Sequence, residues 1–301
     1  MSDYPQVLLF DIGGVCVRKN SCAEVWNGKR IYSNSSQVVS PFQAILDYEK
    51  SKGIPLGYIN HAISASGPTG AWSKIERGDI LLDAEFFRLF KADLSNEKRW
   101  REYYARSIAK TRNVSKGQAA EEAAYQVPPV PEIDVEWLYW RMMTVAREPD
   151  PYMWPALQKL RKAADGDRKG KLILGALSNT SIFPPGHPLT DETTPEGKQN
   201  KELKGVFDIF VSSAHVGLRK PDEEIYKYAI TRLHEHVKLN ELGKGVRPQD
   251  ITFFDDIGTN LRTAKKLGMK TVKVQLGRAD LAVKELEKIT GLSLLEGKSK
   301  L

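Results

Sequence analysis

Cysteine is scarce in this sequence, and long hydrophobic runs are missing. There are two cysteines in 301 residues, Cys16 and Cys22, and we interpret them as reduced thiols. No apolar run approaches the ~20 residues that a membrane helix needs. No basic segment precedes the short apolar stretch near the amino terminus, as it would in a secretory signal. These absences favour a soluble intracellular protein.

Positive charge is not concentrated in any run of the chain. The net charge is +7 and the isoelectric point is about 9.1, but the lysines and arginines are scattered among acidic residues. We therefore expect neither a nucleic-acid partner nor a membrane partner. A basic rim that attracts phosphorylated or CoA-bearing small molecules fits this pattern better.

Four short polar clusters follow apolar runs or open a helix. They are Asp11, Ser178-Asn179, Lys220-Pro221 and Asp255-Asp256. Apolar runs such as residues 7–10 and 172–177 are typical of buried strands in a parallel sheet. In doubly wound sheets, ligands collect where the strands end at their carboxyl side. The clusters would then share one pocket, with the carboxylates, ammonium and hydroxyl that bind a divalent cation and a phosphoryl group.

Each cluster also has a plainer interpretation when it is taken alone. An aspartate after an apolar run is typical of a turn, Ser178-Asn179-Thr180 of an ordinary loop, and Lys220-Pro221-Asp222 of a helix start. The order of the four clusters and their position at strand ends favour the shared pocket.

The four clusters resemble the motifs of the haloacid dehalogenase superfamily of aspartate-nucleophile hydrolases. Four further stretches resemble the amino-terminal phosphatase domain of soluble epoxide hydrolases and the related domains fused to some acyl-CoA dehydrogenases. They are DDIGTNL at 255–261, KLGM at 266–269, GPTG at 67–70 and ERGDI at 76–80. The resemblance implies an α/β fold, a Rossmann-like doubly wound parallel sheet with an inserted, mainly helical cap.

The resemblance also implies a nucleophile and a metal site. Asp11 would attack phosphorus and form an aspartyl-phosphate, which splits a difficult hydrolysis into two displacements. The same carboxylate would bind Mg2+ together with the backbone carbonyl of Gly13 and the side chain of Asp256.

The remaining motif residues would bind the phosphoryl group or support those that do. Lys220 would supply fixed positive charge that lets the nucleophile approach an anionic substrate. Ser178 and the amide of Asn179 would hydrogen-bond the phosphoryl oxygens. Asp255 would pair with Lys220. Asp255 and Asn260 would both lie behind the residues that contact the phosphoryl group.

Gly13 departs from the phosphatase pattern. Phosphatases of this superfamily usually carry a second aspartate two residues after the nucleophile, where it protonates the leaving alkoxide and later activates water. Its absence removes a general acid whose contribution is typically about 10² to 10⁴ in rate. The domains fused to acyl-CoA dehydrogenases show the same Gly-Gly-Val sequence, and an acidic leaving group or an acid from the cap would replace the missing function. His215 is a candidate acid, although a packed or solvated histidine is the more ordinary interpretation.

Three functions therefore remain open at this stage. The first is a Mg2+-dependent phosphatase acting through Asp11 on a phosphorylated organic metabolite, with an acyl or acyl-CoA-linked phosphate as one candidate. The second is a catalytically silent binding or scaffold protein that kept the metal site. The third is a hydrolase that cleaves another bond through Asp11. Dehalogenases of the superfamily also lack the second aspartate, but they do not present a pair like Asp255-Asp256, so the pair argues against dehalogenation.

The spacing of the motifs predicts the domain organisation. The interval from Asp11 to Ser178 is too long for a simple crossover. We therefore assign residues 1–17 and 150–301 to the catalytic core and residues 18–149 to a helical cap inserted after the first motif.

Individual elements follow from the local pattern. Strands are expected to end at Leu177, Val211, Phe254 and Val274. Helices are expected around residues 42–46 and 86–90, with Asp83 as the cap of the second, and at 222–234 and 259–267. We interpret residues 193–198 as a loop, and Trp137, Trp140 and Trp154 as core residues.

The chain ends in Ser299-Lys300-Leu301, a peroxisomal address when it stands at a free carboxyl terminus. Such an address is read by an import receptor and implies a eukaryotic source. We expect the segment from Gly291 to Lys298 to be an exposed tether for it. Without this address, the expected location is the cytoplasm.

Overall fold

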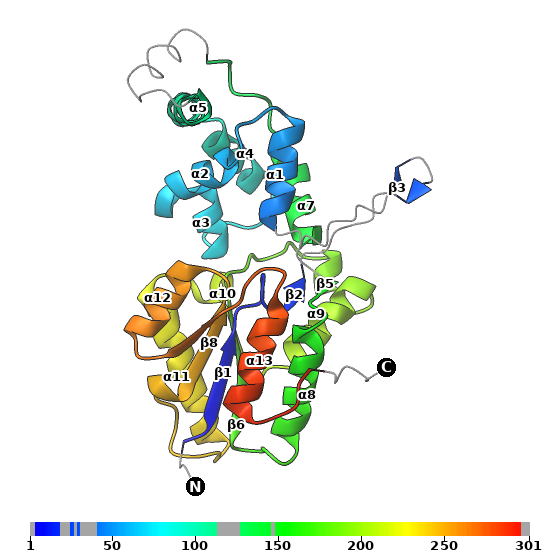
Figure 1. The fold of residues 1–301 in the computed structure, drawn as a ribbon, viewed down its shortest axis with the longest axis vertical. Helices are drawn as coiled ribbons and strands as arrows, with labels where there is room; N and C mark the ends of the chain where they lie inside the picture. The colour runs from blue at the N-terminus through cyan, green and yellow to red at the C-terminus, as the bar shows by residue number, and fades with distance from the viewer. Residues whose placement is uncertain are drawn as a thin grey trace.

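The computed structural model describes residues 4–18, 25–26, 29–30, 41–112, 127–145 and 148–295 of the chain. A five-stranded sheet between layers of helices forms the lower part of the molecule in Figure 1. A group of helices lies above the upper edge of this sheet. The lower part is called the core below, and the upper group of helices is called the cap.

The core sheet is entirely parallel, with the strand order β7-β6-β1-β8-β9. The strands are β1 (Gln6–Phe10), β6 (Leu172–Ser178), β7 (Ile209–Ser212), β8 (Ile251–Asp255) and β9 (Lys270–Lys273). All residues of β6 and β8 are buried, as expected where helices cover both faces of a sheet. The predicted doubly wound parallel sheet is confirmed, and each predicted strand end lies next to the observed one.

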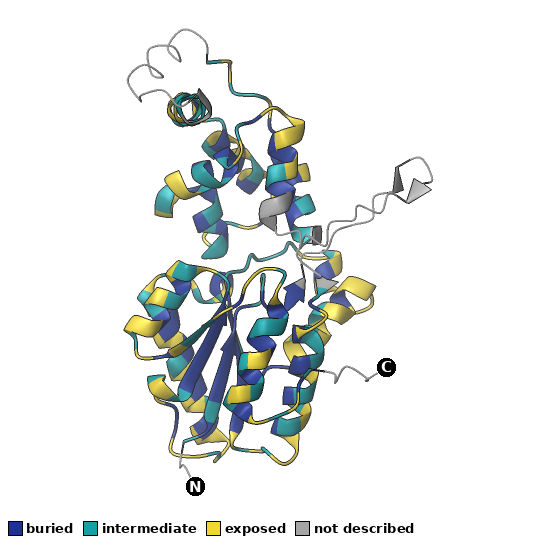
Figure 2. Ribbon diagram, in the orientation of Figure 1, coloured by how far each residue is buried: buried dark blue, intermediate teal, exposed yellow. Residues whose placement is uncertain are grey.

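Successive residues of β1 point to opposite faces of the sheet, and each face has its own hydrophobic cluster. Leu8 and Phe10 belong to the cluster built with α8 (Met153–Asp165) and α13 (Ala279–Thr290). Val7 and Leu9 belong to the cluster built with α11 (Glu223–Leu239) and α12 (Gly258–Lys266). Figure 2 shows the buried strands between helices whose outer sides are exposed. The central strand is therefore held on both faces, which fixes the position of the residue that follows it.

The cap consists of helices with a hydrophobic cluster of their own. They are α1 (Pro41–Ser51), α2 (Tyr58–Ala65), the 3-10 turn η1 (Gly67–Thr69), α3 (Ala71–Glu76), α4 (Ala84–Leu94), α5 (Glu97–Arg112) and α7 (Val135–Val145). The cluster combines aliphatic side chains with several aromatic ones, among them Tyr58, Phe86, Phe90 and Tyr139. Asp83 caps α4 as predicted, because its side chain accepts the N–H groups of residues 85 and 86.

Two short antiparallel pairings accompany the crossing between core and cap. β2 (Val17–Arg18) pairs with β5 (Glu148–Pro149), so the outgoing and returning connections lie side by side. β3 (Val25–Trp26) pairs with β4 (Lys29–Arg30). None of the described helices is both long and apolar enough to cross a membrane.

Residues 193–198 do not form the predicted loop, because most of them belong to a helix. α9 (Pro195–Gly205) begins after Thr194, whose hydroxyl accepts the N–H of Gly197 at 3.0 Å. A threonine followed by proline is a helix-start signal as well as a turn signal. The polar composition of the stretch concealed this second possibility.

Two smaller predictions also need correction. α11 continues to Leu239, beyond the predicted end at His234, because Leu233 and Val237 keep the buried side of the helix apolar. Trp137 is 51% exposed and is not a core residue, since its ring lies on the surface at 5.5 Å from that of Tyr48. Trp140 is partly buried against the cap cluster and Trp154 against the cluster built with α8 and α13, as predicted.

The segment after Gly291 is not an exposed tether over its described part. Gly291 ends α13 with a left-handed backbone at φ 71°, which turns the chain back onto the core. Leu294 is buried in the cluster with α8 and α13, and Lys159 donates to its carbonyl at 2.8 Å. Glu287 accepts the N–H groups of residues 294 and 295. The tripeptide at 299–301 lies outside the described residues.

Candidate functional site

The predicted motif residues meet at the carboxyl edge of the sheet. Asp11 follows β1, Ser178 ends β6, and Asp255 ends β8. Lys220 lies in the loop before α11. They border, or lie directly behind, a cleft of about 730 Å³ between core and cap. The core side of its lining comprises Asp11, Gly13, Ser178, Asn179, Arg219, Lys220, Pro221, Asp222, Asp256, Ile257, Thr259 and Asn260.

Lys220 lies at the centre of an ion-pair network. Its side chain is 2% exposed, and Nζ lies 2.8 Å from Oδ1 of Asp11 and 2.9 Å from Oδ2 of Asp255. Burial alone would lower the pKa of this ammonium, but the two aspartates outweigh it and raise the pKa. Lys220 is therefore a fixed cation beside the predicted nucleophile.

Asp255 is held rigidly behind the cleft. Asn260 donates to both of its carboxylate oxygens, at 3.2 and 3.0 Å, and the N–H of Ile257 donates to Oδ1 at 2.7 Å. With Lys220 on Oδ2, this fully buried carboxylate is surrounded by donors. The structure thus places Asp255 and Asn260 behind the lysine.

The negative charge at and around Asp11 exceeds the positive charge that Lys220 supplies. Burial raises the pKa of its carboxyl to about 7, Lys220 opposes that rise, and Asp255 and Asp256 add to it. Ligand atoms of the three aspartates all lie within 4.8 Å of one another. A hard divalent cation prefers oxygen ligands and would relieve this repulsion. The site is therefore able to bind a metal ion.

The side chain of Asn179 fixes the backbone of Lys220. Its Oδ1 accepts the Lys220 N–H at 2.8 Å, and its Nδ2 donates to the Lys220 carbonyl at 3.0 Å. Ser178 is buried beside it in the lining of the cleft, with its hydroxyl 3.4 Å from the Asn179 carbonyl. The second and third motifs are thereby joined directly, a contact that the sequence did not reveal.

The two glycines after the nucleophile differ sharply in their surroundings. A Cβ on Gly13 would meet nothing within 4 Å, whereas a Cβ on Gly14 would lie 2.7 Å from Oδ2 of Asp256. Gly14 also has a φ of 84°, which L side chains rarely adopt. Cys16 is buried just beyond and donates to the Asp11 carbonyl at 3.1 Å. Cys22 lies outside the described residues.

The structure offers two acidic side chains besides the aspartate trio in the cleft. They are Glu76 from the cap and the exposed Asp222 from the core. The described lining residues include no histidine or tyrosine. His215 is exposed, lies outside this lining and contacts Ser212 at 2.7 Å, so it does not replace the missing acid.

Sequence reasoning missed Glu76 and Arg219 as site residues. Arg219 Nη2 lies 2.6 Å from Glu76 Oε2, which joins cap and core across the cleft. Glu76 opens the ERGDI stretch and Arg219 precedes Lys220, so position in the motifs was the available signal. Their pairing could not be seen because 143 residues separate them.

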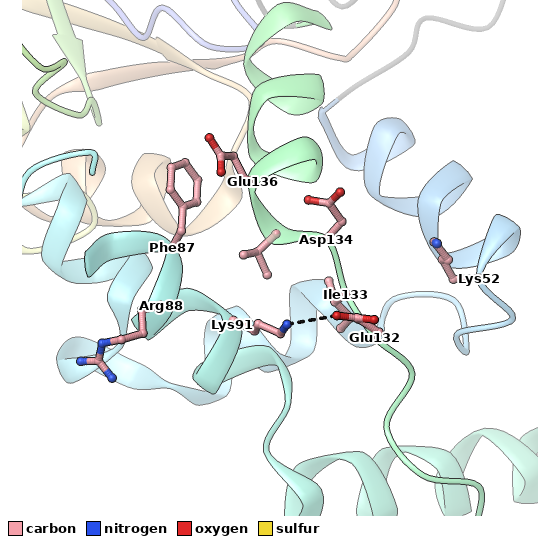
Figure 3. A pocket seen from close by; sticks show the side chains of 9 residues that line it. Lys52, Phe87, Arg88, Lys91, Glu132, Ile133, Asp134 and Glu136 are labelled. Carbon is pink, nitrogen blue, oxygen red and sulfur yellow. Dashed lines mark hydrogen bonds and ion pairs between the residues drawn. The ribbon is translucent and has the colours of Figure 1, made fainter. Parts of the chain in front are cut away.

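A second hollow, of about 590 Å³, lies on the cap (Figure 3). It is lined by Lys52, Phe87, Arg88, Lys91, Glu132, Ile133, Asp134, Val135 and Glu136. Its lining contains both basic and acidic side chains, and Lys91 pairs with Glu132 at 3.4 Å. It contains none of the motif residues, so the catalytic candidates belong to the cleft between core and cap.

The family assignment follows from a match over most of the chain. The profile of the haloacid dehalogenase-like hydrolases matches residues 5–268, and the chain belongs to this family of hydrolases. Bifunctional epoxide hydrolase 2 of Sus scrofa is 24% identical over 251 residues, which cover 82% of this chain and 36% of that protein. Acyl-CoA dehydrogenase family member 10 of Mus musculus is 38% identical over 88 residues, which cover 29% of this chain and 7% of that protein. The predicted superfamily is thus confirmed, while the chain spans only about a third of the pig protein.

Solved structures that align with most of this chain include two bacterial proteins. A predicted HAD-like family hydrolase from Porphyromonas gingivalis aligns with a TM-score of 0.47 and 17% identity, covering 94% of this chain and 97% of that one. A HAD family enzyme from Bacteroides thetaiotaomicron, in complex with magnesium and inorganic phosphate, aligns with a TM-score of 0.44 and 14% identity. This second alignment covers 91% of this chain and 96% of that one.

The contrast between the adjacent glycines gives a matched pair of variants. Gly14→Ala should lower the free energy of unfolding by at least about 1 to 2 kcal/mol, because the left-handed backbone strains an L residue. The new methyl would also displace Asp256. Gly13→Ala should change stability by no more than about 0.5 kcal/mol, since its Cβ enters open space. Urea denaturation followed by circular dichroism measures both, and equal losses would contradict the description of this turn.

Proposed function

We propose that this chain is a Mg2+-dependent phosphatase that hydrolyses a phosphorylated organic metabolite through an aspartyl-phosphate on Asp11. The observation that carries the proposal is the ion-pair network at the cleft floor, where Lys220 bridges Asp11 and Asp255. A fixed cation beside a buried carboxylate lets that carboxylate approach an anionic phosphoryl group. Membership of a hydrolase family supports the same conclusion.

Asp11, Asp256 and the backbone carbonyl of Gly13 are the groups that would hold Mg2+. The bound cation would supply positive charge for the phosphoryl oxygens and lower the repulsion between the carboxylates. Oxygen donors from only a few protein groups suit this ion, because it keeps several of its waters. The cluster of three aspartates fits such a cation.

The chemistry proceeds in two displacements at phosphorus. Oδ1 of Asp11 accepts the N–H of Ile12 at 2.7 Å and faces Lys220, so we assign the attack to Oδ2. The new Oδ2–P bond forms as the P–O bond to the leaving group breaks. Water then forms a bond to phosphorus and releases a proton to solvent, and the aspartyl–phosphate bond breaks to return the carboxylate and inorganic phosphate. Lys220 and the hydroxyl of Ser178 would steady the phosphoryl oxygens in both steps.

The cap side of the cleft is suited to binding an organic leaving group. Apolar side chains from four cap helices line it, namely Ile45, Ile63, Trp72, Met142 and Met143. Apolar walls around a few convergent polar groups are typical of small-molecule sites. An acyl or acyl-CoA-linked phosphate is one candidate that such walls would accept.

Position 13 constrains the leaving group. Without a general acid there, a substrate whose leaving group is already acidic needs little protonation and should react best. The same glycine favours a second candidate, a catalytically silent binding protein that kept the metal site. Cleavage of a different bond through Asp11 is the third. Turnover measurements separate the three.

Metal binding tests the first part of the proposal. Asp256→Asn should weaken Mg2+ binding by at least tenfold in isothermal titration, because it removes one of two anionic ligands, an effect of about the size seen at other metal sites. Asp222→Asn removes an exposed charge from the same cleft and should bind Mg2+ as the parent does. If both variants bind equally well, Asp256 is not a ligand.

The pH dependence of the same titration follows from the raised pKa of Asp11. Only the ionised carboxylate binds the cation, so affinity is fully developed above about pH 7 and falls as pH drops through that value. Binding at pH 6 should therefore release protons, which titration in two buffers of different ionisation enthalpy detects. Proton release that is the same at pH 6 and pH 8 would contradict this.

Turnover of a phosphate panel tests the chemistry itself. We expect the parent to hydrolyse at least one phosphate with an acidic leaving group. Asp11→Asn should abolish both this turnover and the Mg2+-dependent binding of beryllofluoride. Gly13→Asp, which places a carboxyl in open space, should raise the rate on ordinary monoesters by about 10² to 10⁴. Gly205→Asp adds the same charge at an exposed glycine and should change nothing. Absence of turnover across phosphate esters, acyl phosphates and CoA-linked phosphates would favour the silent protein.

We also propose that Ser299-Lys300-Leu301 directs the protein to peroxisomes where Leu301 carries a free carboxyl group. A fluorescent protein fused to the amino terminus should then collect in peroxisomes, and deletion of the tripeptide should return it to the cytosol. Asp11→Asn in the same fusion should still reach peroxisomes, since the address is separate from the catalytic site. A diffuse signal from the intact fusion would defeat this proposal.

A further inference from the structure

Glu76 joins the cap to the catalytic core through its backbone and its side chain. It is the last residue of α3, and its backbone carbonyl accepts the hydroxyl of Ser213 at 2.5 Å. Two residues later, a Cβ on Gly78 would lie 2.1 Å from the carbonyl oxygen of Ala214, so the two backbones are in direct contact. The carboxylate of Glu76 is consequently held over the core in one position.

The Glu76 carboxylate is surrounded by N–H donors. Arg219 donates from Nε to Oε2 at 2.8 Å and its Nη2 lies 2.6 Å from the same oxygen. Nδ2 of Asn179 lies 3.4 Å from Oε2, and Nε1 of Trp72 donates to Oε1 at 3.0 Å. The side chains of Glu76 and Arg219 are only 15% and 23% exposed.

These contacts argue against Glu76 as the missing proton donor. Burial raises the pKa of Glu76 above its ordinary value although Arg219 opposes the rise, and in each of these hydrogen bonds the carboxylate is the acceptor. A protonated carboxyl would present its own hydrogen to these donors and lose at least one of the bonds. The hydrogen-bond pattern therefore favours the ionised form of Glu76.

Asn179 carries the effect of Glu76 to the catalytic lysine. One amide side chain makes both hydrogen bonds to the Lys220 backbone, and the same Nδ2 reaches Glu76. Arg219 is also the chain neighbour of Lys220. The Glu76 carboxylate thus contacts the side chain of Asn179, which is hydrogen-bonded to the Lys220 backbone, and that of Arg219, which precedes Lys220 in the chain. The Lys220 ammonium in turn contacts Asp11.

We propose that Glu76 is a positioning residue, which holds Arg219 and Asn179 from the cap so that the Lys220 ammonium stays aligned with Asp11. Its bearing on catalysis rests on the proposed phosphatase function, but its effect on the Lys220 backbone does not. The cap would then contribute to the reaction through core geometry as well as through the walls of the cleft. Loss of Glu76 also leaves Arg219 as a largely buried cation with no carboxylate partner.

Glu76→Gln tests this role, because it keeps the size of the side chain and removes its charge. We expect kcat to fall about 10- to 100-fold, as for a small misplacement of a catalytic group, with KM changed by less than about threefold. Glu76→Asp, which retains the charge, should recover part of the loss. Glu85→Gln, the same change at an exposed cap glutamate paired with Arg88, is the control and should keep the parent kcat.

Arg219→Gln and the double variant with Glu76→Gln show whether the two side chains act as a unit. If they do, kcat of the double variant should be no lower than that of the poorer single variant. Independent, multiplying losses would overturn the pairing. Thermal melting of every variant shows whether the molecules are equally folded, so that a purely structural defect is recognised by a lower midpoint with an unchanged kcat per folded molecule.

Hydrogen exchange gives a readout that does not depend on turnover. The Lys220 N–H is donated to Asn179, so its exchange should speed up at least tenfold in Glu76→Gln and stay at the parent rate in Glu85→Gln. If the parent turns over no phosphate, the proposed function fails and exchange alone decides the role of Glu76. A parent-like exchange rate at Lys220 in Glu76→Gln would overturn the proposal in either case, as would a parent-like kcat in an active enzyme.

Discussion

The ion pairs of Lys220 constrain the rest of this site, because a buried ammonium is stable only where carboxylates and hydrogen bonds replace its water. Its partners come from separate strands, Asp11 after β1 and Asp255 at the end of β8. Parallel pairing of these adjacent strands places both carboxylates at one edge, with Phe10 opposite Phe254 in register. The sheet thus determines where the charges meet, and the charges determine what the edge can bind.

The negative charge of the cluster exceeds what one lysine compensates. Asp11, Asp255 and Asp256 lie together beside the buried ammonium of Lys220, and burial, followed by the two neighbouring aspartates, raises the pKa of Asp11. The remaining charge is suited to a cation, and a phosphoryl group would in turn be suited to the cation and Lys220 together. In the proposed reaction, the cation would therefore compensate the excess negative charge of the aspartates, and the phosphoryl group would compensate the positive charge of the cation and Lys220.

The fold and the core part of the site could be predicted from the sequence because their signals are local. Apolar runs that end in a polar residue marked the strand ends next to Asp11, Ser178 and Asp255. What escaped prediction depends on contacts between distant segments. The Glu76–Arg219 pair and the packing of Leu294 form only when cap, loop and core are assembled. The local hydrophobic pattern of the sequence therefore does not predict them. α9 escaped for another reason, since Thr194-Pro195 is typical both of a turn and of a helix start.

No steric constraint requires glycine at position 13, so its presence is better explained by the chemistry of the site. Its neighbour Gly14 must be glycine, because Asp256 lies against it and its backbone is left-handed. Position 13 has neither constraint, so an aspartate would fit there without displacing any described atom within reach of its Cβ. Position 13 thus has room for a general acid and does not carry one, while the Glu76 carboxylate from the cap is paired with Arg219. A reaction at this site would depend on a leaving group that departs without help, and the apolar cap walls would then select the organic group attached to it.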